Sequence, residues 1–214
     1  MAIYLDSAII SEAKIAQTFG WVKGITTNPT LLAKTDLPVK DTLEKLAELT
    51  KVPVFYQLIS TELQDMVDEG KKAFKIIGEQ TVLKIPATTV GFQAVSRLAH
   101  KITCSVTAIY SPAQAAIAKE AGAKYAIAYV NRATKLLGDG ISLVKDMATI
   151  LADSNTEILA ASIKSPEEAA ASLKAGAHHL TLPLAMLESI ATHQFSLDTV
   201  AEFNKNGRGL VTID

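Results

Sequence analysis

Short apolar runs alternate with longer stretches of helical periodicity along the whole chain. Runs rich in Val, Ile and aromatic residues that end at Pro, Gly or a polar residue predict buried strands. Between them, apolar residues recur three and four positions apart, as at Leu43, Leu46 and Ala47. This spacing predicts helices that pack one face on a core, so the pattern predicts a regular alternation of strand and helix.

The expected strands are Ala2–Asp6, Val22–Asn28, Val52–Ile59, Thr81–Ile85, Ile102–Ile109, Tyr125–Val130, Glu157–Ile163 and His179–Leu182. The expected helices are Ser11–Phe19, Thr30–Lys34, Lys40–Thr50, Thr61–Ile77, Thr89–His100, Pro112–Glu120, Gly140–Ala152, Pro166–Lys174, Leu184–Ala191 and Leu197–Asn204. Ser11 is the expected N-cap of the first helix, because a serine oxygen can accept a free N–H of the first turn.

Eight strand–helix units follow one another with no shift in composition between them. Strict alternation implies a parallel sheet with helical crossovers, and eight units in a chain of 214 residues fit a closed (β/α)8 barrel, the TIM-barrel fold. We therefore expect a single barrel domain over residues 1–214, in which residues 197–214 form an extra C-terminal helix and tail. The alternative is an open, doubly wound sheet, which usually has a Gly-rich phosphate turn after its first strand. Gly20–Gly24 has neither the spacing nor the position of such a turn.

The composition of the chain argues against several classes of protein. The formal net charge is −1 and no block of like charge occurs, which argues against a nucleic-acid partner or a membrane surface. The single cysteine, Cys104, excludes an internal disulfide framework and suits a reducing compartment. No long apolar run and no signal-peptide layout is visible, so we expect a cytoplasmic protein.

Lys84 is the most informative residue, because it stands inside the apolar strand Thr81–Ile85. Burial of an ammonium is costly unless the group is paired or neutral, and desolvation lowers the pKa of a lysine. A neutral amine can attack a carbonyl and form a Schiff base. The alternatives are a strand-end lysine that reaches solvent and a lysine paired with a carboxylate.

Polar residues also occur near the carboxyl ends of most other expected strands, where barrel active sites lie. They are Asp6, Thr26, Asn28, Gln57, Thr107, Tyr129, Arg132, Ser162 and Lys164. Strand alternation predicts that Lys84 faces the lumen above Val82, and that Ser162 and Lys164 share a face opposite Ala161. Strand ends are often polar because they meet loops, which explains part of this set.

Several motifs in this order resemble the transaldolase family of class I aldolases. They are Asp6, Thr26-Thr-Asn-Pro29, Lys84-Ile-Pro86, Tyr129-Val-Asn-Arg132, Ala160-Ala-Ser-Ile-Lys164 and Thr181-Leu-Pro183. Length and motif order are similar to the short subfamily, which contains fructose-6-phosphate aldolases and short transaldolases. The resemblance implies a (β/α)8 barrel in which Lys84 is the Schiff-base lysine.

Two positions separate the activities within this family. Transaldolases typically have a glutamate in the third strand and a phenylalanine in the sixth, whereas aldolases have glutamine and tyrosine there. Gln57 and Tyr129 make this chain similar to the aldolases. The resemblance thus implies reversible cleavage of fructose 6-phosphate to dihydroxyacetone and glyceraldehyde 3-phosphate. Transaldolase activity in the pentose phosphate pathway is the close alternative, and a non-catalytic sugar-phosphate-binding barrel is a third.

The resemblance also implies roles for the other residues. Tyr129 exchanges the proton, with a water held by Gln57 and Thr107, while Asp6 and Asn28 hold substrate hydroxyls and Thr26 supports them. Asp6 as a purely structural polar group is the alternative.

Arg132 and Ser162 are the phosphate candidates, because a guanidinium makes bidentate bonds to phosphate. The alternative for Arg132 is a surface ion pair with Asp139. Lys164 either contributes to the phosphate site or forms a salt bridge at its rim.

We expect no metal and no cofactor, because a Schiff base requires neither and no ligand motif occurs. His178 and His179 are adjacent in a strand and point to opposite sides, and His100 and His193 stand alone. The expected partners are a small sugar-phosphate substrate and other copies of the chain. The family forms pentamers or decamers in which the terminal helix reaches a neighbouring subunit.

Overall fold

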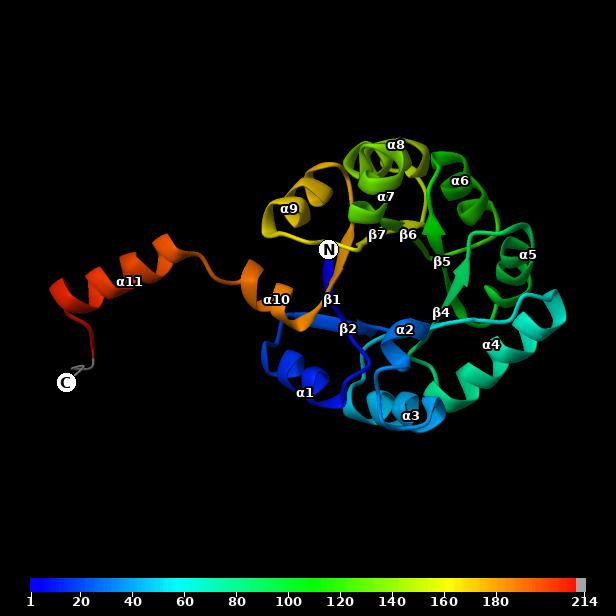
Figure 1. Cartoon of the computed structure of the whole chain (residues 1–214), viewed down its shortest axis with the longest axis horizontal. Helices are drawn as coiled ribbons and strands as arrows, with labels where there is room; N and C mark the ends of the chain where they lie inside the picture. Colours follow the sequence, from blue (N-terminus) through cyan, green and yellow to red (C-terminus); the bar gives the residue numbers. More distant parts are fainter. Residues whose placement is uncertain (211–214) are drawn as a thin grey trace.

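Eight parallel strands form a closed barrel in the computed structural model, which describes residues 1–210 (Figure 1). The strands are β1 (Ala2–Asp6), β2 (Val22–Thr26), β3 (Val54–Gln57), β4 (Thr81–Pro86), β5 (Thr103–Ile109), β6 (Tyr125–Tyr129), β7 (Glu157–Ala161) and β8 (His179–Leu182). Each strand pairs in parallel with the next, and β8 pairs with β1. This order confirms the predicted (β/α)8 barrel and rules out the open sheet.

Helices surround the barrel as an outer ring (Figure 1). The helices before the C-terminal extension are α1 (Ile10–Thr18), α2 (Pro29–Leu32), α3 (Val39–Leu49), α4 (Leu63–Ile77), α5 (Thr89–Leu98), α6 (Pro112–Glu120), α7 (Val130–Leu137), α8 (Gly140–Leu151), α9 (Pro166–Lys174) and α10 (Leu184–Ile190). A last helix, α11 (Gln194–Asn206), lies outside the ring. The largest buried cluster lies between the sheet and these helices.

Side chains alternate between the lumen and the helix layer, as the period of two in a strand requires. A separate cluster fills the lumen and consists mainly of Tyr4, Phe55, Val82, Tyr125, Ile127 and Leu159. Leu83 and Ile85 belong instead to the core between sheet and helices. Lys84 therefore lies above Val82 on the lumen side, as predicted.

The start of α1 differs from the prediction that Ser11 is its N-cap. The helix begins at Ile10, and Ile9 occupies the N-cap position with no side-chain hydrogen bond. Ser11 is therefore inside the first turn, where its hydroxyl is past the position that a cap requires. Ser7 contributes a local bond instead, because its Oγ accepts the N–H of Ile9 at 3.1 Å.

The segment after β6 also differs from the prediction. The strand ends at Tyr129, and Val130–Leu137 forms α7, where no helix was expected before Gly140. The buried residues of α7 are Val130 and Ala133, three positions apart, which is the spacing of one helix face. Arg132 therefore lies in the first turn of a helix.

Ser162 breaks the predicted alternation at the end of β7. Its φ of 60° lies in the left-handed region, which residues other than glycine rarely adopt. The prediction placed Ser162 opposite Ala161, but both residues line the same cavity above the lumen. Ile163 then points into the outer core. Ala161 lies in the lumen cluster with Leu159, so regular alternation already faces it inward and the predicted phase of β7 was wrong. The left-handed turn brings Ser162 to the same cavity.

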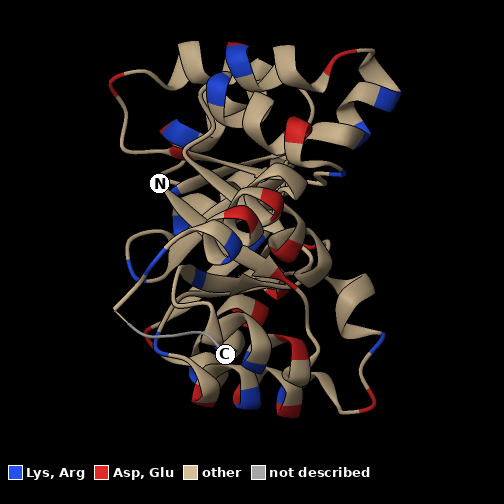
Figure 2. Cartoon of the chain, turned by 90° about the vertical axis from the view of Figure 1, so that its left-hand side faces the viewer, with Lys and Arg blue, Asp and Glu red and all other residues tan. Residues whose placement is uncertain are grey.

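Helix α11 extends away from the barrel and has no buried residue (Figure 1). The predicted C-terminal helix Leu197–Asn204 lies inside it, and residues 211–214 of the predicted tail lie outside the described residues. Acidic and basic residues are interspersed over the helices and loops in the view of Figure 2. Within residues 1–210, no helix has both the length and the apolar character needed to span a membrane.

Candidate active site

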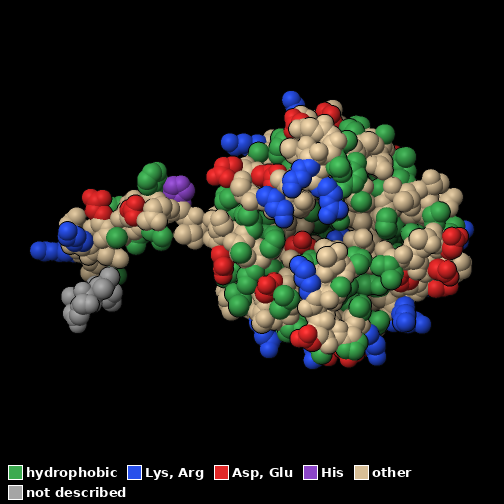
Figure 3. Space-filling model, viewed as in Figure 1, with side chains coloured by type: hydrophobic (Ala, Val, Ile, Leu, Met, Phe, Trp, Pro, Cys, Tyr) green, Lys and Arg blue, Asp and Glu red, His purple; other side chains and the backbone are tan. Residues whose placement is uncertain are grey.

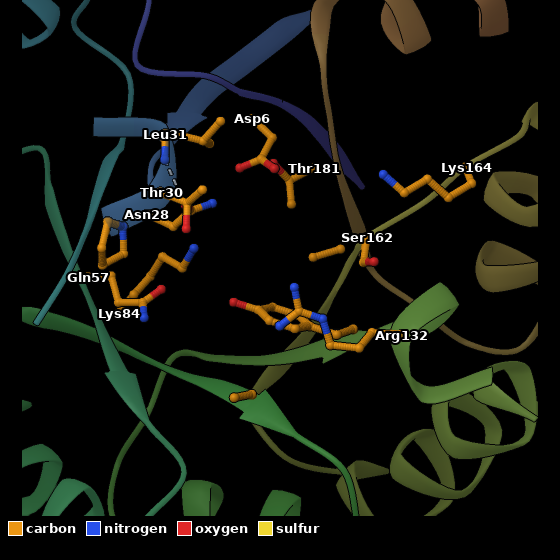
Figure 4. A pocket seen from close by; sticks show the side chains of 14 residues that line it. Asp6, Asn28, Thr30, Leu31, Gln57, Lys84, Arg132, Ser162, Lys164 and Thr181 are labelled. Atoms are coloured by element: carbon orange, nitrogen blue, oxygen red, sulfur yellow. Dashed lines mark hydrogen bonds between the residues drawn. The ribbon is translucent and has the colours of Figure 1, made fainter. Parts of the chain in front are cut away.

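A cavity of about 430 Å³ opens at the carboxyl end of the barrel (Figure 4). It is of the size that small-molecule sites commonly have. Most of the predicted site residues line it: Asp6, Asn28, Gln57, Lys84, Tyr129, Arg132, Ser162 and Lys164. Thr26 and Thr107 are fully buried behind this wall and bond to residues that line it. The fold therefore brings together side chains that are far apart in the sequence.

Lys84 is buried on β4, with only 4% of its surface exposed. Its Nζ donates a hydrogen bond to the backbone oxygen of Thr27 at 2.8 Å. Burial lowers the pKa of Lys84 to about 8, and the negative charge of Asp6 opposes part of that shift. Within residues 1–210, no carboxylate forms a salt bridge with this amine. At pH 7 about a tenth of the amine is then neutral, against roughly one in a thousand or fewer for an ordinary lysine.

Asp6 is held by a chain of hydroxyl groups at the ends of β1, β2 and β8. Thr26 Oγ1 donates to Asp6 Oδ1 at 2.8 Å, and the hydroxyl of Thr181 bonds to Thr26 Oγ1. Since the Thr26 proton is used on Asp6, Thr181 is the donor of the second bond. This arrangement fixes one carboxylate oxygen of Asp6 at the cavity wall.

Asn28 is placed by the start of α2. It is the N-cap of this helix, and its Oδ1 accepts the N–H of Leu31 at 3.0 Å, the bond drawn in Figure 4. Pro29 follows at the first helical position, where a missing N–H costs nothing. Because the oxygen of the Asn28 amide is engaged, its NH₂ group is the part left for a ligand.

Tyr129 and Thr107 form a polar pair on the opposite side of the cavity from Asp6. Thr107 Oγ1 donates to the Tyr129 hydroxyl at 2.9 Å, which leaves the phenol proton available to another acceptor. Burial raises the pKa of Tyr129, and Asp6 raises it further, while Thr107 and Arg132 lower it. The phenol is therefore protonated at neutral pH.

Gln57 lies beside Lys84, since the two residues pair across β3 and β4. Its Oε1 is buried and has no hydrogen-bond partner among the described residues. A buried carbonyl oxygen without a partner is costly, so a bound water or ligand group is the expected partner.

Two cations stand at the mouth of the cavity. The guanidinium of Arg132 lies over the ring of Tyr129, 5.1 Å from its centre, and Lys164 lines the same cavity. Figure 3 shows Lys and Arg side chains gathered beside the central opening. Asp139, the alternative partner of Arg132, instead caps α8 and accepts the N–H groups of Ile141 and Ser142. Within residues 1–210, Arg132 therefore forms no ion pair with Asp139, and it lines the cavity.

Residues that the sequence analysis did not assign to the site also line the cavity. They are Pro29, Thr30, Leu31, Ala108, Ala161 and Thr181. Alternation with the apolar Leu180 and Leu182 could have placed Thr181 in the lumen. No such signal exists for Ala108, which joins the wall through a left-handed turn with φ 60°.

The opposite end of the lumen has a different polar cluster. His179 Nδ1 accepts the N–H of Ala2 at 3.0 Å, and its Nε2 lies 3.1 Å from Glu157, although the imidazole N–H is not aligned for a hydrogen bond. Burial lowers the pKa of His179, with Glu157 opposing. This cluster ties β8 to β1. Within residues 1–210, no group of three or more His, Cys, Asp or Glu residues could hold a metal ion.

Known proteins with similar sequences belong to one family. The profile described as Transaldolase/Fructose-6-phosphate aldolase matches residues 3–210. A probable transaldolase of Hydrogenobaculum sp. (strain Y04AAS1) is 37% identical over 209 residues, which is 96% of this chain and 96% of the relative. A probable transaldolase of Aquifex aeolicus (strain VF5) is 36% identical over 196 residues, or 90% of each chain.

Solved structures agree on the fold at much lower identity. A mandelate oxidase mutant with a monooxide FMN adduct superposes with a TM-score of 0.62 at 15% identity, over 94% of this chain and 70% of the oxidase. At this identity the similarity supports the barrel alone. The family profile spans residues 3–210, which include every cavity residue described above, and the two relatives cover 96% and 90% of the chain. The chain therefore belongs to the transaldolase/fructose-6-phosphate aldolase family.

Proposed function

We propose that this protein is a Schiff-base aldolase that reversibly cleaves fructose 6-phosphate to dihydroxyacetone and glyceraldehyde 3-phosphate. The observation that carries the proposal is Lys84, a buried amine of lowered pKa at the floor of an open polar cavity. Such an amine is a nucleophile near neutral pH, and enzymes use lysines of this kind on carbonyl substrates.

The first step forms the covalent intermediate. Neutral Nζ of Lys84 adds to the ketone carbon, and loss of water from the adduct gives an imine, which takes up a proton. The backbone oxygen of Thr27, 2.8 Å from Nζ, holds the amine at the cavity wall before the substrate enters. The amine then has a defined position for attack, which reduces the entropic cost of the step.

The second step breaks the bond between the third and fourth carbons. Its electron pair moves into the protonated imine and leaves an enamine on Lys84, while the hydroxyl of the fourth carbon loses its proton and becomes an aldehyde. We propose that Tyr129 accepts this proton through a water held by Gln57 and Thr107. In the direction of synthesis the phenol donates this proton, and in cleavage the phenolate form of Tyr129 accepts it along the same path.

Substrate contacts follow from the remaining wall residues. The Asp6 carboxylate and the NH₂ group of Asn28 would bind the hydroxyls of the three-carbon unit, with Thr26 fixing Asp6. Arg132 and Ser162 would bind the phosphate at the other end of the cavity, since a guanidinium suits a dianion. Lys164 adds a second cation there.

The fate of the enamine separates the two activities of the family. Protonation at the third carbon and hydrolysis release dihydroxyacetone, which is aldolase chemistry. Attack on a second aldose phosphate transfers the unit, which is transaldolase chemistry. The phenol of Tyr129 and the amide of Gln57 favour the first, because they supply a proton donor and a water site beside Lys84. The printed names of the relatives favour transaldolase as the second candidate.

One assay distinguishes the two candidates. Fructose 6-phosphate is incubated with the protein, with and without erythrose 4-phosphate, and free dihydroxyacetone is measured. An aldolase releases dihydroxyacetone in the absence of the acceptor. A transaldolase forms sedoheptulose 7-phosphate with the acceptor and releases almost no dihydroxyacetone without it, which would overturn the aldolase assignment.

A further inference from the structure

Two separate segments supply the phosphate candidates at the cavity mouth. Arg132 lies in the first turn of α7, and Ser162 lies just after β7. A phosphate that binds both requires that these segments hold a fixed separation, because charge-assisted bonds depend on distance and direction. The contacts between the two segments therefore set the geometry of the anion site.

A closed set of hydrogen bonds joins these two segments. The backbone oxygen of Ser162 accepts the N–H of Asn131 at 3.2 Å. The side chain of Asn131 in turn donates its Nδ2 to Glu168 Oε1 at 3.3 Å. The other carboxylate oxygen of Glu168 accepts the backbone N–H of Lys164 at 2.6 Å. Glu168 thus contacts the residue before Arg132 and the residue two positions after Ser162.

The position of Glu168 is itself fixed. It stands in the first turn of α9, and its N–H donates to the Oγ of Ser165, the N-cap of that helix, at 3.1 Å. Each carboxylate oxygen of Glu168 already accepts an N–H group, one from the Asn131 amide and one from the backbone of Lys164. Glu168 does not line the cavity, and any effect on an anion would act through its neighbours.

These hydrogen bonds surround a residue with a strained backbone, Ser162. A serine at φ 60° is strained, and such a conformation persists only where surrounding contacts hold it. The bond from Asn131 holds the carbonyl oxygen of Ser162 itself, and the bond from Lys164 to Glu168 holds the backbone two residues later. Without them the segment could relax and carry the Ser162 hydroxyl away from the cavity.

We propose that Glu168 is a positioning residue for the anion site, which holds the segments of Arg132 and Ser162 in register for the phosphate of the substrate. The proposal rests on the proposed function for the identity of the substrate, but not for the existence of the anion site. It predicts that loss of Glu168 weakens phosphate recognition selectively and leaves the chemistry at Lys84 in place.

The first experiment measures binding of inorganic phosphate by calorimetry, which needs no catalysis. Glu168→Ala is expected to raise the Kd for phosphate about tenfold, the effect of one misplaced charge-assisted contact. Glu168→Gln keeps one acceptor oxygen and is expected to fall between Glu168→Ala and wild type. Glu167→Ala is the matched control, because it removes the neighbouring acidic residue from the same helix turn.

A second experiment compares two acceptors in the addition of dihydroxyacetone. With glyceraldehyde 3-phosphate, Glu168→Ala is expected to raise KM about tenfold, and with unphosphorylated glyceraldehyde to change it less than about twofold. The double variant of Asn131→Ala with Glu168→Ala is expected to match Glu168→Ala alone in its phosphate Kd, because both residues act through one network.

The outcomes separate this proposal from the proposed function. An unchanged phosphate Kd in Glu168→Ala, no phosphate binding by wild type, or an equal loss with both acceptors would overturn the role of Glu168. Phosphate binding that depends on Glu168, in a protein that neither cleaves nor forms carbon–carbon bonds, would support Glu168 and overturn the aldolase assignment.

Discussion

Lys84 combines a buried amine with neighbours that neither neutralise it fully nor leave it exposed. The cost of burying the ammonium appears as a pKa lowered to about 8, and no salt bridge within residues 1–210 offsets it. Asp6 is close enough to oppose this shift, and Thr26 and Thr181 hold it in place. The pKa of Lys84 is therefore set by the balance between burial and one carboxylate.

The first prediction concerns the pH dependence of cleavage. Because only neutral Lys84 attacks, kcat/KM should rise by about tenfold per pH unit below a pKa of about 8 and level off above it. Asp6→Asn removes the charge that raises this pKa, so the midpoint should move to lower pH. A pH–rate profile of wild type and Asp6→Asn checks both points. A midpoint that moves to higher pH, or stays unchanged, would contradict the assigned balance.

The second prediction concerns Tyr129. Tyr129→Phe removes the phenol that accepts from Thr107, and aldol cleavage should fall at least about tenfold, a modest loss for a general acid–base group. The ratio of transfer to cleavage should rise, since the enamine loses its proton donor. Tyr110→Phe is the control, because Tyr110 packs edge-on against Tyr129 but does not line the cavity. Cleavage at the wild-type rate would remove Tyr129 from proton transfer.

At the scale of single elements, the order of strands and helices could be predicted from the sequence. Periodicity alone separates Lys84 and Val82 from Leu83, because successive side chains of a strand always alternate. The clustering of polar residues at the carboxyl ends of parallel strands then follows from the closure of the barrel.

The two strand ends that depart from regular geometry could not be predicted. Ala108 and Ser162 both have φ 60°, and neither residue type favours the left-handed region. Tertiary contacts impose these turns, such as the bond from Asn131 to Ser162. Local sequence does not reveal such contacts, so Ala108 was missing from the predicted site. Ala161 was missing for another reason: the phase of β7 was assigned from Ser162, although Ala161 faces the lumen with Leu159.

The third prediction tests how β4 is held against α5. An added Cβ at Gly91 would overlap the backbone oxygen of Pro86, the last residue of the strand that carries Lys84. Gly91→Ala should therefore lower the free energy of unfolding by about 2 kcal/mol through overpacking. Gln93→Ala on the exposed side of α5 should change it by less than about 0.5 kcal/mol. Equal urea midpoints for the two variants would show that β4 and α5 are not tightly packed there.

At the scale of the whole molecule, α11 is the part that the barrel does not explain. Its apolar residues remain exposed, with 74% of Phe195 and 66% of Phe203 accessible. An isolated helix of this length is marginal in water, so a packing partner is expected. We propose that α11 packs on another copy of the chain, in agreement with the homo-oligomer that the sequence analysis predicted.

The fourth prediction follows from this exposure. After removal of residues 194–214 the barrel should still fold and unfold cooperatively, because no residue of α11 is buried in it. Analytical ultracentrifugation should show a monomer for the truncated chain and a larger assembly for the full chain. Phe203→Asp should act in the same direction, whereas Lys205→Ala on the same helix should not. A monomeric full-length chain would contradict this role of α11.

Formation of a Schiff base by Lys84 is tested most directly by borohydride reduction of the protein in the presence of dihydroxyacetone, followed by peptide mass spectrometry. We expect a permanent adduct on Lys84 in wild type and none in Lys84→Met. The variant should remain folded, because replacement of a buried amine by an apolar side chain of similar length is often neutral or stabilising. A wild-type protein that binds sugar phosphate but shows no adduct on Lys84 would contradict the Schiff-base mechanism and leave a sugar-phosphate-binding barrel.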